Sequence, residues 1–281
     1  MNKQKLIVIV GSTASGKTSL GIQIAKKFNG GIISADSRAI YREMNIGTAK
    51  PARSTIPSME PVSSEFDESI VPIPGGAWSG FAGDSRSEPG MTNNDEYLVD
   101  GVRHYGFDLV NPDEHFQALD FKKFAEANIN EITLRGKVPI VVGGTGLYIS
   151  GLVDNFDFEG GVVGESKYDV LQIGLKVDRQ ILYDRIDHRV DEMIEQGLVD
   201  EVRALKEKYG CAVKSMTGIG YRQICEYLDG EVGIETAIEN LKRDSRHYAK
   251  RQMTWFKRDN RIHWIEDAQD AIKLVTKFFA I

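Results

Sequence analysis

The chain has 281 residues, enough for one large domain or two ordinary ones with a sizeable core. With 41% hydrophobic residues, 27% charged residues and a formal net charge of -6, it has a soluble globular composition that neither supports nor excludes RNA binding. No apolar run approaches the ~20 residues of a membrane span, and the short start leaves no room for a signal peptide, so we expect a cytoplasmic protein. Only two cysteines, Cys211 and Cys225, are present, which predicts a reducing compartment and no disulfide framework.

The first element is an apolar, β-branched run over residues 6–10, which predicts a buried strand of a parallel sheet. The next eight residues match G-x-x-x-x-G-K-[ST], the phosphate-binding P-loop, and a helix is predicted from Lys17 to Phe28. Such a loop points its backbone N–H groups at an anion, at the positive end of the helix dipole. We therefore expect a diphosphate or triphosphate to be bound by Gly11, Thr13, Ala14, Ser15, Gly16, Lys17 and Thr18. Lys17 would carry a charge to the terminal phosphate, and Thr18 is the predicted ligand of Mg²⁺.

A second strand is predicted over residues 30–36, and Asp36 stands at its carboxyl end. Ligands bind at that end in open parallel sheets, so Asp36 is predicted to face the same crevice as Lys17. The alternative is that Asp36 only caps the following helix. Residues 52–94 are rich in Pro, Ser and Gly, which predicts a long irregular insertion.

Regular structure is predicted to resume over residues 105–110, followed by a helix from Leu119 to Leu134 and a strand over 138–142. The last of these runs into a glycine-rich turn, Gly143 to Gly146, in which Thr145 offers a hydroxyl to a ligand.

The next predicted elements are a strand over 171–177 and a helix that begins at Arg179. We expect Arg179 or Arg185 to reach the bound phosphates, although a charged stripe is usually a solvated face. The last third is predicted to be helical: Met193 to Tyr209, a helix after Gly220, and a long helix from about Gly233 to Lys257 before a final strand. The long helix interleaves basic and aromatic residues, which suits a nucleic acid, and the alternative is a core helix with a solvated basic face.

Five blocks of the sequence, in order, resemble the tRNA dimethylallyltransferases, also called tRNA isopentenyltransferases. They are the P-loop G-S-T-A-S-G-K-T, the block from Asp36 to Pro51, G-G-T-G-L-Y from Gly143, G-Y-R-Q from Gly220, and Y-A-K-R-Q-M-T-W-F from Tyr248. The resemblance covers most of the chain, except about 52–102 and a gap near 154–164. It implies a P-loop NTPase-like α/β fold, with a parallel sheet flanked by helices and a helical C-terminal third. We expect residues 1–153 to form the core with its insertion, and 154–281 to add the rest of the core and a helical RNA-binding part.

The resemblance also implies the reaction, which is transfer of a dimethylallyl group from dimethylallyl diphosphate to N6 of an adenine next to the anticodon of tRNA. Asp36 is then the candidate general base, and Arg222 is the candidate second cation on the diphosphate, beside Lys17, Thr18 and Mg²⁺. The implied tRNA contacts are Asp36, Ser37, Arg38, Ala39, Thr145, Arg243, Arg246 and Lys250. We expect a monomer.

Two departures from the family concern the RNA. Ala39 stands where family members usually carry a glutamine, and the helical insertion after the G-G-T-G-L-Y block, with its basic R-x-x-R-A-L-type helix, is missing. A smaller acceptor such as free AMP is therefore the first alternative. A P-loop nucleotide kinase and an inactive P-loop binding module are the others.

Overall fold

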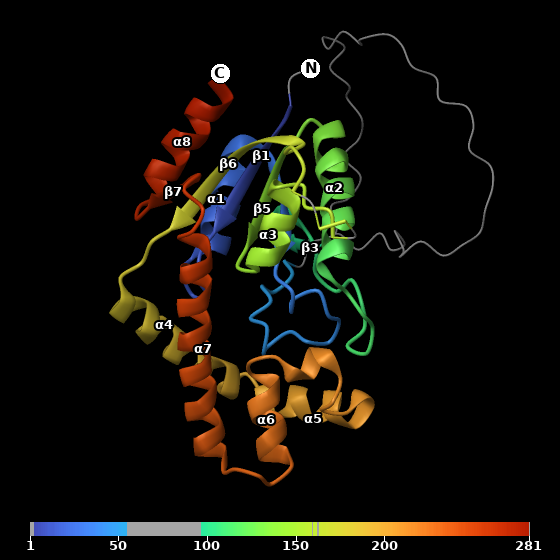
Figure 1. Ribbon diagram of the computed structural model, residues 1–281. Coiled ribbons are helices and arrows are strands. Elements are labelled where there is room, and N and C mark those ends of the chain that lie inside the picture. The colour runs from blue at the N-terminus through green and yellow to red at the C-terminus, as the bar shows by residue number, and fades with distance from the viewer. Residues whose placement is uncertain (1–2, 55–96, 159, 162, 281) are drawn as a thin grey trace, which may run out of the picture.

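The computed structural model describes residues 3–54, 97–158, 160–161 and 163–280. Within them, one seven-stranded sheet has the order β3-β4-β2-β5-β1-β6-β7 (Figure 1). The strands are β1 (Gln4–Val10), β2 (Gly30–Ala35), β3 (Tyr97–Val99), β4 (Val102–Tyr105), β5 (Val138–Gly143), β6 (Tyr168–Leu175) and β7 (Ile262–Ile265). All neighbouring strands are parallel except β3 and β4. The predicted α/β class is confirmed.

Helices cover both faces of this sheet. The helices of the described residues are α1 (Lys17–Phe28), α2 (Ala118–Leu134), α3 (Gly146–Val153), α4 (Arg179–Glu195), α5 (Leu198–Tyr209), α6 (Tyr221–Leu228), α7 (Ile234–Phe256) and α8 (Ala268–Ala280), of which α5 and α6 lie away from the sheet. Successive residues of β1 point to opposite faces: Ile7 and Ile9 share a core with α1 and α8, whereas Leu6 and Val8 share one with α2 and α3. Burial on both faces explains why the central strands are continuous apolar runs.

The register brings three strand ends level with one another. β5 lies between β1 and β2, and Gly143 pairs with both Val10 and Ala35. The turns that follow these three strands therefore meet at one edge of the sheet, where parallel α/β proteins bind ligands.

A small helical lobe lies beyond that edge. Helices α5 and α6 and the start of α7 pack around their own core, which includes Met216, Tyr221 and Leu241, and Ile40 and Met44 join it from the loop after β2. Figure 1 shows this loop, in blue, between the sheet and the lobe, while α7 runs from the lobe back to the sheet.

The structure differs from the sequence predictions in three elements. The regular structure predicted to resume over 105–110 lies earlier and ends at Tyr105, because Gly106 (φ 97°) and Asp108 (φ 55°) turn the chain through the left-handed region. Helices α3 and α8 were not predicted. Most of the insertion predicted over 52–94 lies outside the described residues.

The cysteines also differ from expectation. Cys211 and Cys225 form a disulfide, with Cα atoms 6.2 Å apart. The prediction that the chain has no disulfide framework is therefore wrong for this pair. The packing of α6 against the end of α5 brings together two residues separated by 14 positions, which composition alone does not show.

Candidate functional site

The P-loop has the backbone of an anion cradle. Ala14 (φ 60°) and Gly16 (φ 91°) adopt left-handed conformations, and α1 begins directly after Gly16. Ser15 is buried, and its hydroxyl has no hydrogen-bond partner among the described residues. A Cβ placed on Gly11 would lie 2.7 Å from that Oγ, so glycine keeps the cradle open. A buried hydroxyl without a partner in such a cradle suits an oxygen of a bound diphosphate.

Lys17 lies near two charged groups at this edge, Asp36 and Arg189. Its ammonium group donates a hydrogen bond to the Ser12 carbonyl at 3.1 Å. Loss of hydration lowers the pKa of Lys17 to about 8, while the charge of Asp36 acts to raise it and that of Arg189 acts to lower it. The predicted proximity of Lys17 and Asp36 is thus present in the folded chain.

Asp36 lines the crevice as predicted, and what it caps is a turn, because no helix directly follows β2 among the described residues. Its Oδ1 accepts hydrogen bonds from the backbone N–H groups of Arg38 (2.8 Å) and Ala39 (3.3 Å), so it does cap the turn after β2. Its Oδ2 has no partner among the described residues, and Asp36 lines a cavity of about 540 Å³. One carboxylate oxygen holds the turn, and the other is available to a ligand.

This cavity, which we call the central cavity, lies between the P-loop, the loop after β2 and helices α4, α6 and α7. Its polar lining comprises Thr13, Asp36, Ser37, Arg38, Thr48, Arg189, Thr217, Arg222, Asp244, Ser245, Tyr248 and Arg251. Cations outnumber carboxylates in this lining, which favours an anionic ligand.

Arg189, on α4, is the arginine that reaches the P-loop. Its Nη1 lies 3.4 Å from Thr13 Oγ1, and burial lowers its pKa. The sequence analysis named Arg179 or Arg185 for this position, but both are exposed and Arg179 lies over the ring of Tyr183. The helical periodicity indicated the right helix and missed the residue that faces the loop.

Helix α7 joins the P-loop to the glycine-rich turn after β5. Buried Gln252 accepts a hydrogen bond from Thr13 N–H (2.8 Å) and donates one to the Gly144 carbonyl (3.0 Å). Thr145 Oγ1 in the same turn accepts from Ser37 N–H at 3.1 Å.

Burial, reinforced by the charge of Asp36, raises the pKa of Tyr248 to about 12, so this cavity-lining hydroxyl stays neutral at physiological pH. Gln252 was not singled out from the sequence, although it lies in the Y-A-K-R-Q block, and Tyr248 was considered only as one of the aromatic residues of the long basic helix.

Arg222 lies in the wall of the central cavity, but it already has partners. Its Nη2 is 2.7 Å from Asp244 Oδ2, and its Nε is 3.8 Å from Glu226 Oε1. A role on the diphosphate would require it to exchange these carboxylates for phosphate oxygens.

Some basic residues of α7 are held in ion pairs, and others are exposed without one among the described residues. Arg246 contacts both oxygens of Asp187 on α4 at 2.6 Å, and Arg243 lies 3.2 Å from Asp244. Lys250 is exposed and has no ion pair within the described part of the chain. Of the predicted RNA contacts in this helix, Lys250 is therefore the most available. Ala39, by contrast, is only 3% exposed.

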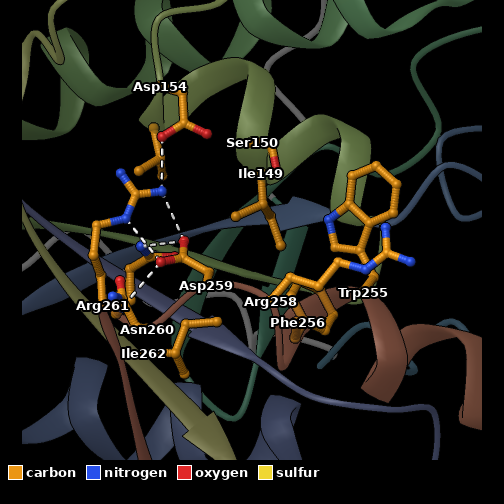
Figure 2. Close-up of a pocket in the computed structure, with 12 residues that line it drawn as sticks. Ile149, Ser150, Asp154, Trp255, Phe256, Arg258, Asp259, Asn260, Arg261 and Ile262 are labelled. Carbon is orange, nitrogen blue, oxygen red and sulfur yellow. Dashed lines mark hydrogen bonds and ion pairs between the residues drawn. The ribbon is translucent and has the colours of Figure 1, made fainter.

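Figure 2 shows a second cavity, of about 410 Å³, between α3, β6 and the end of α7. Arg261 bridges Asp154 and Asp259 at its floor, both at 2.7 Å, and Trp255 stands at the opposite side. None of the predicted catalytic residues lines it. Arg261, Asp154 and Asp259 satisfy one another, which indicates a structural network on this side of the cavity.

Two kinds of feature are absent from the described residues, a cluster of metal-ligating side chains and a membrane-spanning helix. Among the described residues, no three His, Cys, Asp or Glu side chains gather where they could hold a metal ion. No helix in the described part of the chain is long and apolar enough to cross a membrane.

Comparison with known proteins identifies two matching family models and close relatives along nearly the whole chain. The family model described as isopentenyl transferase matches residues 4–63, and the one described as IPP transferase matches 91–163 and 159–259. A tRNA dimethylallyltransferase 2 of Geotalea uraniireducens is 35% identical over 349 aligned positions, which cover 99% of this chain and 98% of the relative. Because this chain has only 281 residues, the relative contains segments that this chain lacks.

Solved structures of tRNA isopentenylpyrophosphate transferases resemble this chain along nearly its whole length. A tRNA isopentenylpyrophosphate transferase of Staphylococcus epidermidis superposes with a TM-score of 0.76 at 33% identity, covering 99% of both chains. One from Bacillus halodurans has a TM-score of 0.75 at 31% identity, covering 99% of this chain and 96% of its own. Near-full-length identity above 30% coincides with a cavity in which the P-loop and Asp36 meet, and the chain therefore belongs to the tRNA dimethylallyltransferase family of prenyl-transferring enzymes.

Proposed function

We propose that this protein transfers a dimethylallyl group from dimethylallyl diphosphate to N6 of an adenine next to the anticodon of tRNA. The observation that carries the proposal is the meeting of Thr13, Asp36 and Arg189 in the wall of one cavity, with Lys17 close enough to interact with both charged groups. An anion-binding loop and a free carboxylate oxygen are the two groups that this reaction needs.

The donor side requires stabilisation of negative charge. As the allylic C–O bond breaks, charge develops on the departing diphosphate. The P-loop N–H groups, Lys17 and the Ser15 hydroxyl are preorganised to receive it, and each such donor is typically worth about 3–4 kcal/mol. We propose Arg189 as the second cation on the diphosphate, because it contacts the P-loop and Arg222 is held by Asp244. Arg222 stays a prediction.

The acceptor side requires removal of a proton. The exocyclic amine forms a new N–C bond to the allylic carbon and loses a proton, which we assign to Asp36. Its Oδ1 is occupied by the turn, so Oδ2 is the oxygen that would take the proton. A positioned base of this kind contributes roughly 10²- to 10⁴-fold in rate.

Mg²⁺ is part of the proposal. Thr18 is exposed in the first turn of α1, and its hydroxyl has no partner among the described residues. A single hydroxyl fits Mg²⁺ when the other ligands are diphosphate oxygens and water, an arrangement that this ion commonly adopts. When bound, the ion neutralises charge on the diphosphate.

The decisive experiment is a competition between two acceptors. An anticodon stem-loop and AMP are incubated together with the protein, radiolabelled dimethylallyl diphosphate and Mg²⁺, and the products are separated and identified by mass spectrometry. We expect label in the RNA, as N6-dimethylallyladenosine. Label in AMP alone would overturn the tRNA assignment and leave the donor chemistry intact. Replacing the diphosphate with labelled ATP tests the kinase alternative.

A further inference from the structure

Glu201, on the first turns of α5, receives hydrogen bonds from four donors. Its Oε2 accepts from the backbone N–H groups of Asn45 (3.0 Å) and Ile46 (2.8 Å). Its Oε1 accepts from Gly47 N–H (3.1 Å) and from the Tyr221 hydroxyl (2.7 Å). Three consecutive backbone N–H groups converge on this carboxylate, and it has no ion pair within 4.0 Å among the described residues.

The three backbone donors belong to the loop over residues 44–50, which contains no strand or helix of its own. On the side of the sheet, the loop is held by Lys50, whose buried ammonium group donates to the Tyr41 carbonyl (2.9 Å) and to Asp108 (2.6 Å). On the side of the lobe, Glu201 is the acceptor. The loop is therefore fixed between two anchors, one from the core and one from α5.

The same loop forms a wall of the central cavity. Gly47, Thr48 and Ala49 line it together with Asp36. The contact with the lobe is close, because a Cβ on Gly47 would lie 2.6 Å from the Tyr221 ring. A shift of this loop would change the width of the cavity beside the carboxylate that we assign as the base.

We propose that Glu201 is a positioning residue for the acceptor: it holds the loop over residues 44–50 so that the adenine nucleotide of the RNA faces Asp36. The inference rests on the proposed function, since it assigns this wall of the cavity to the acceptor. Glu201 does not touch the diphosphate site. Its contribution is confined to the RNA side of the reaction.

The test is Glu201→Gln, with Asp200→Asn as the matched control. Glutamine keeps the shape of the side chain but replaces one carboxylate oxygen with an NH₂ donor, so two of the four donors lose their acceptor. Asp200 precedes Glu201 on the same helix, is 80% exposed and pairs only with Arg203 among the described residues, so its variant removes the same charge without touching the loop.

We expect Glu201→Gln to lower kcat/KM for an anticodon stem-loop by roughly tenfold or more, given what hydrogen bonds to a charged group contribute. The Kd for dimethylallyl diphosphate, measured by calorimetry in the presence of Mg²⁺, should stay within about twofold of wild type, as should every parameter of Asp200→Asn. Assays are run well below the Tm of each variant, where a purely structural defect would not change the RNA parameters selectively.

Two results would overturn the inference: unchanged kcat/KM for RNA, or an equal loss of diphosphate affinity. If Glu201→Gln does not fold, Tyr221→Phe decides, because it removes one donor and leaves the carboxylate. It should show a smaller selective loss toward RNA, and an unselective effect or none would refute the assignment. A wild-type protein inactive on RNA would instead contradict the proposed function itself.

Discussion

The pKa of Lys17 predicts how diphosphate affinity depends on pH. In the free protein this pKa is lowered to about 8, so about nine in ten ammonium groups are charged at pH 7 and about one in ten at pH 9. The diphosphate binds the charged form, because an ammonium group attracts the anion and a neutral amine does not. Affinity should therefore be nearly constant below about pH 7, halve by about pH 8 and fall steeply above it.

The magnitude follows from the same populations. If only the charged form binds, the apparent Kd should rise about tenfold between pH 7 and pH 9. Phosphate groups have their second pKa near 6, so about nine in ten are already ionised at pH 7 and the ligand contributes little slope of its own. Arginines stay charged throughout, so Arg189 contributes none either.

The assay is calorimetric titration with dimethylallyl diphosphate at fixed Mg²⁺ in half-unit steps from pH 7 to pH 9.5, comparing wild type with Lys17→Met. Methionine keeps much of the side-chain length and cannot titrate. We expect weaker binding by Lys17→Met that does not change with pH. A flat wild-type curve, or the same slope in Lys17→Met, would refute the reasoning, since the titrating group would then be another one.

Three further predictions concern the base, the second cation and the RNA. Asp36→Asn keeps the oxygen that caps the turn, so it should lose roughly 10²- to 10⁴-fold in single-turnover rate with unchanged diphosphate affinity, and a near-normal rate would place the base elsewhere. Arg189→Ala should weaken diphosphate binding about tenfold or more, whereas Arg185→Ala, one turn away and exposed, should leave it within about twofold; equal effects in binding titrations would remove Arg189 from the site. Lys250→Ala should weaken RNA binding and reduce the slope of log K against log salt by about 0.7, as filter binding at several salt concentrations would show. An unchanged slope would mean that Lys250 contacts no phosphate.

The sequence by itself determined the P-loop and its place in the fold. The P-loop is a local structure: strand, glycine turn and helix lie within 25 contiguous positions, from Gln4 to Phe28, so their pattern predicts the cradle, Lys17 and Thr18 without long-range contacts. The alternation of apolar runs predicted the parallel sheet, and the general rule on its carboxyl edge placed Asp36 beside Lys17. The family blocks added the reaction class.

The tertiary structure decided which charges are available. Arg189, Arg222 and Arg246 look alike in the sequence, yet one reaches the P-loop, the next is held by Asp244 and the third is paired with Asp187. The disulfide and the role of Glu201 likewise depend on how α5 packs against α6 and the loop after β2. Helical periodicity gives the face on which a side chain lies, but its partners come from other helices, and the packing angles between helices are set by the whole core.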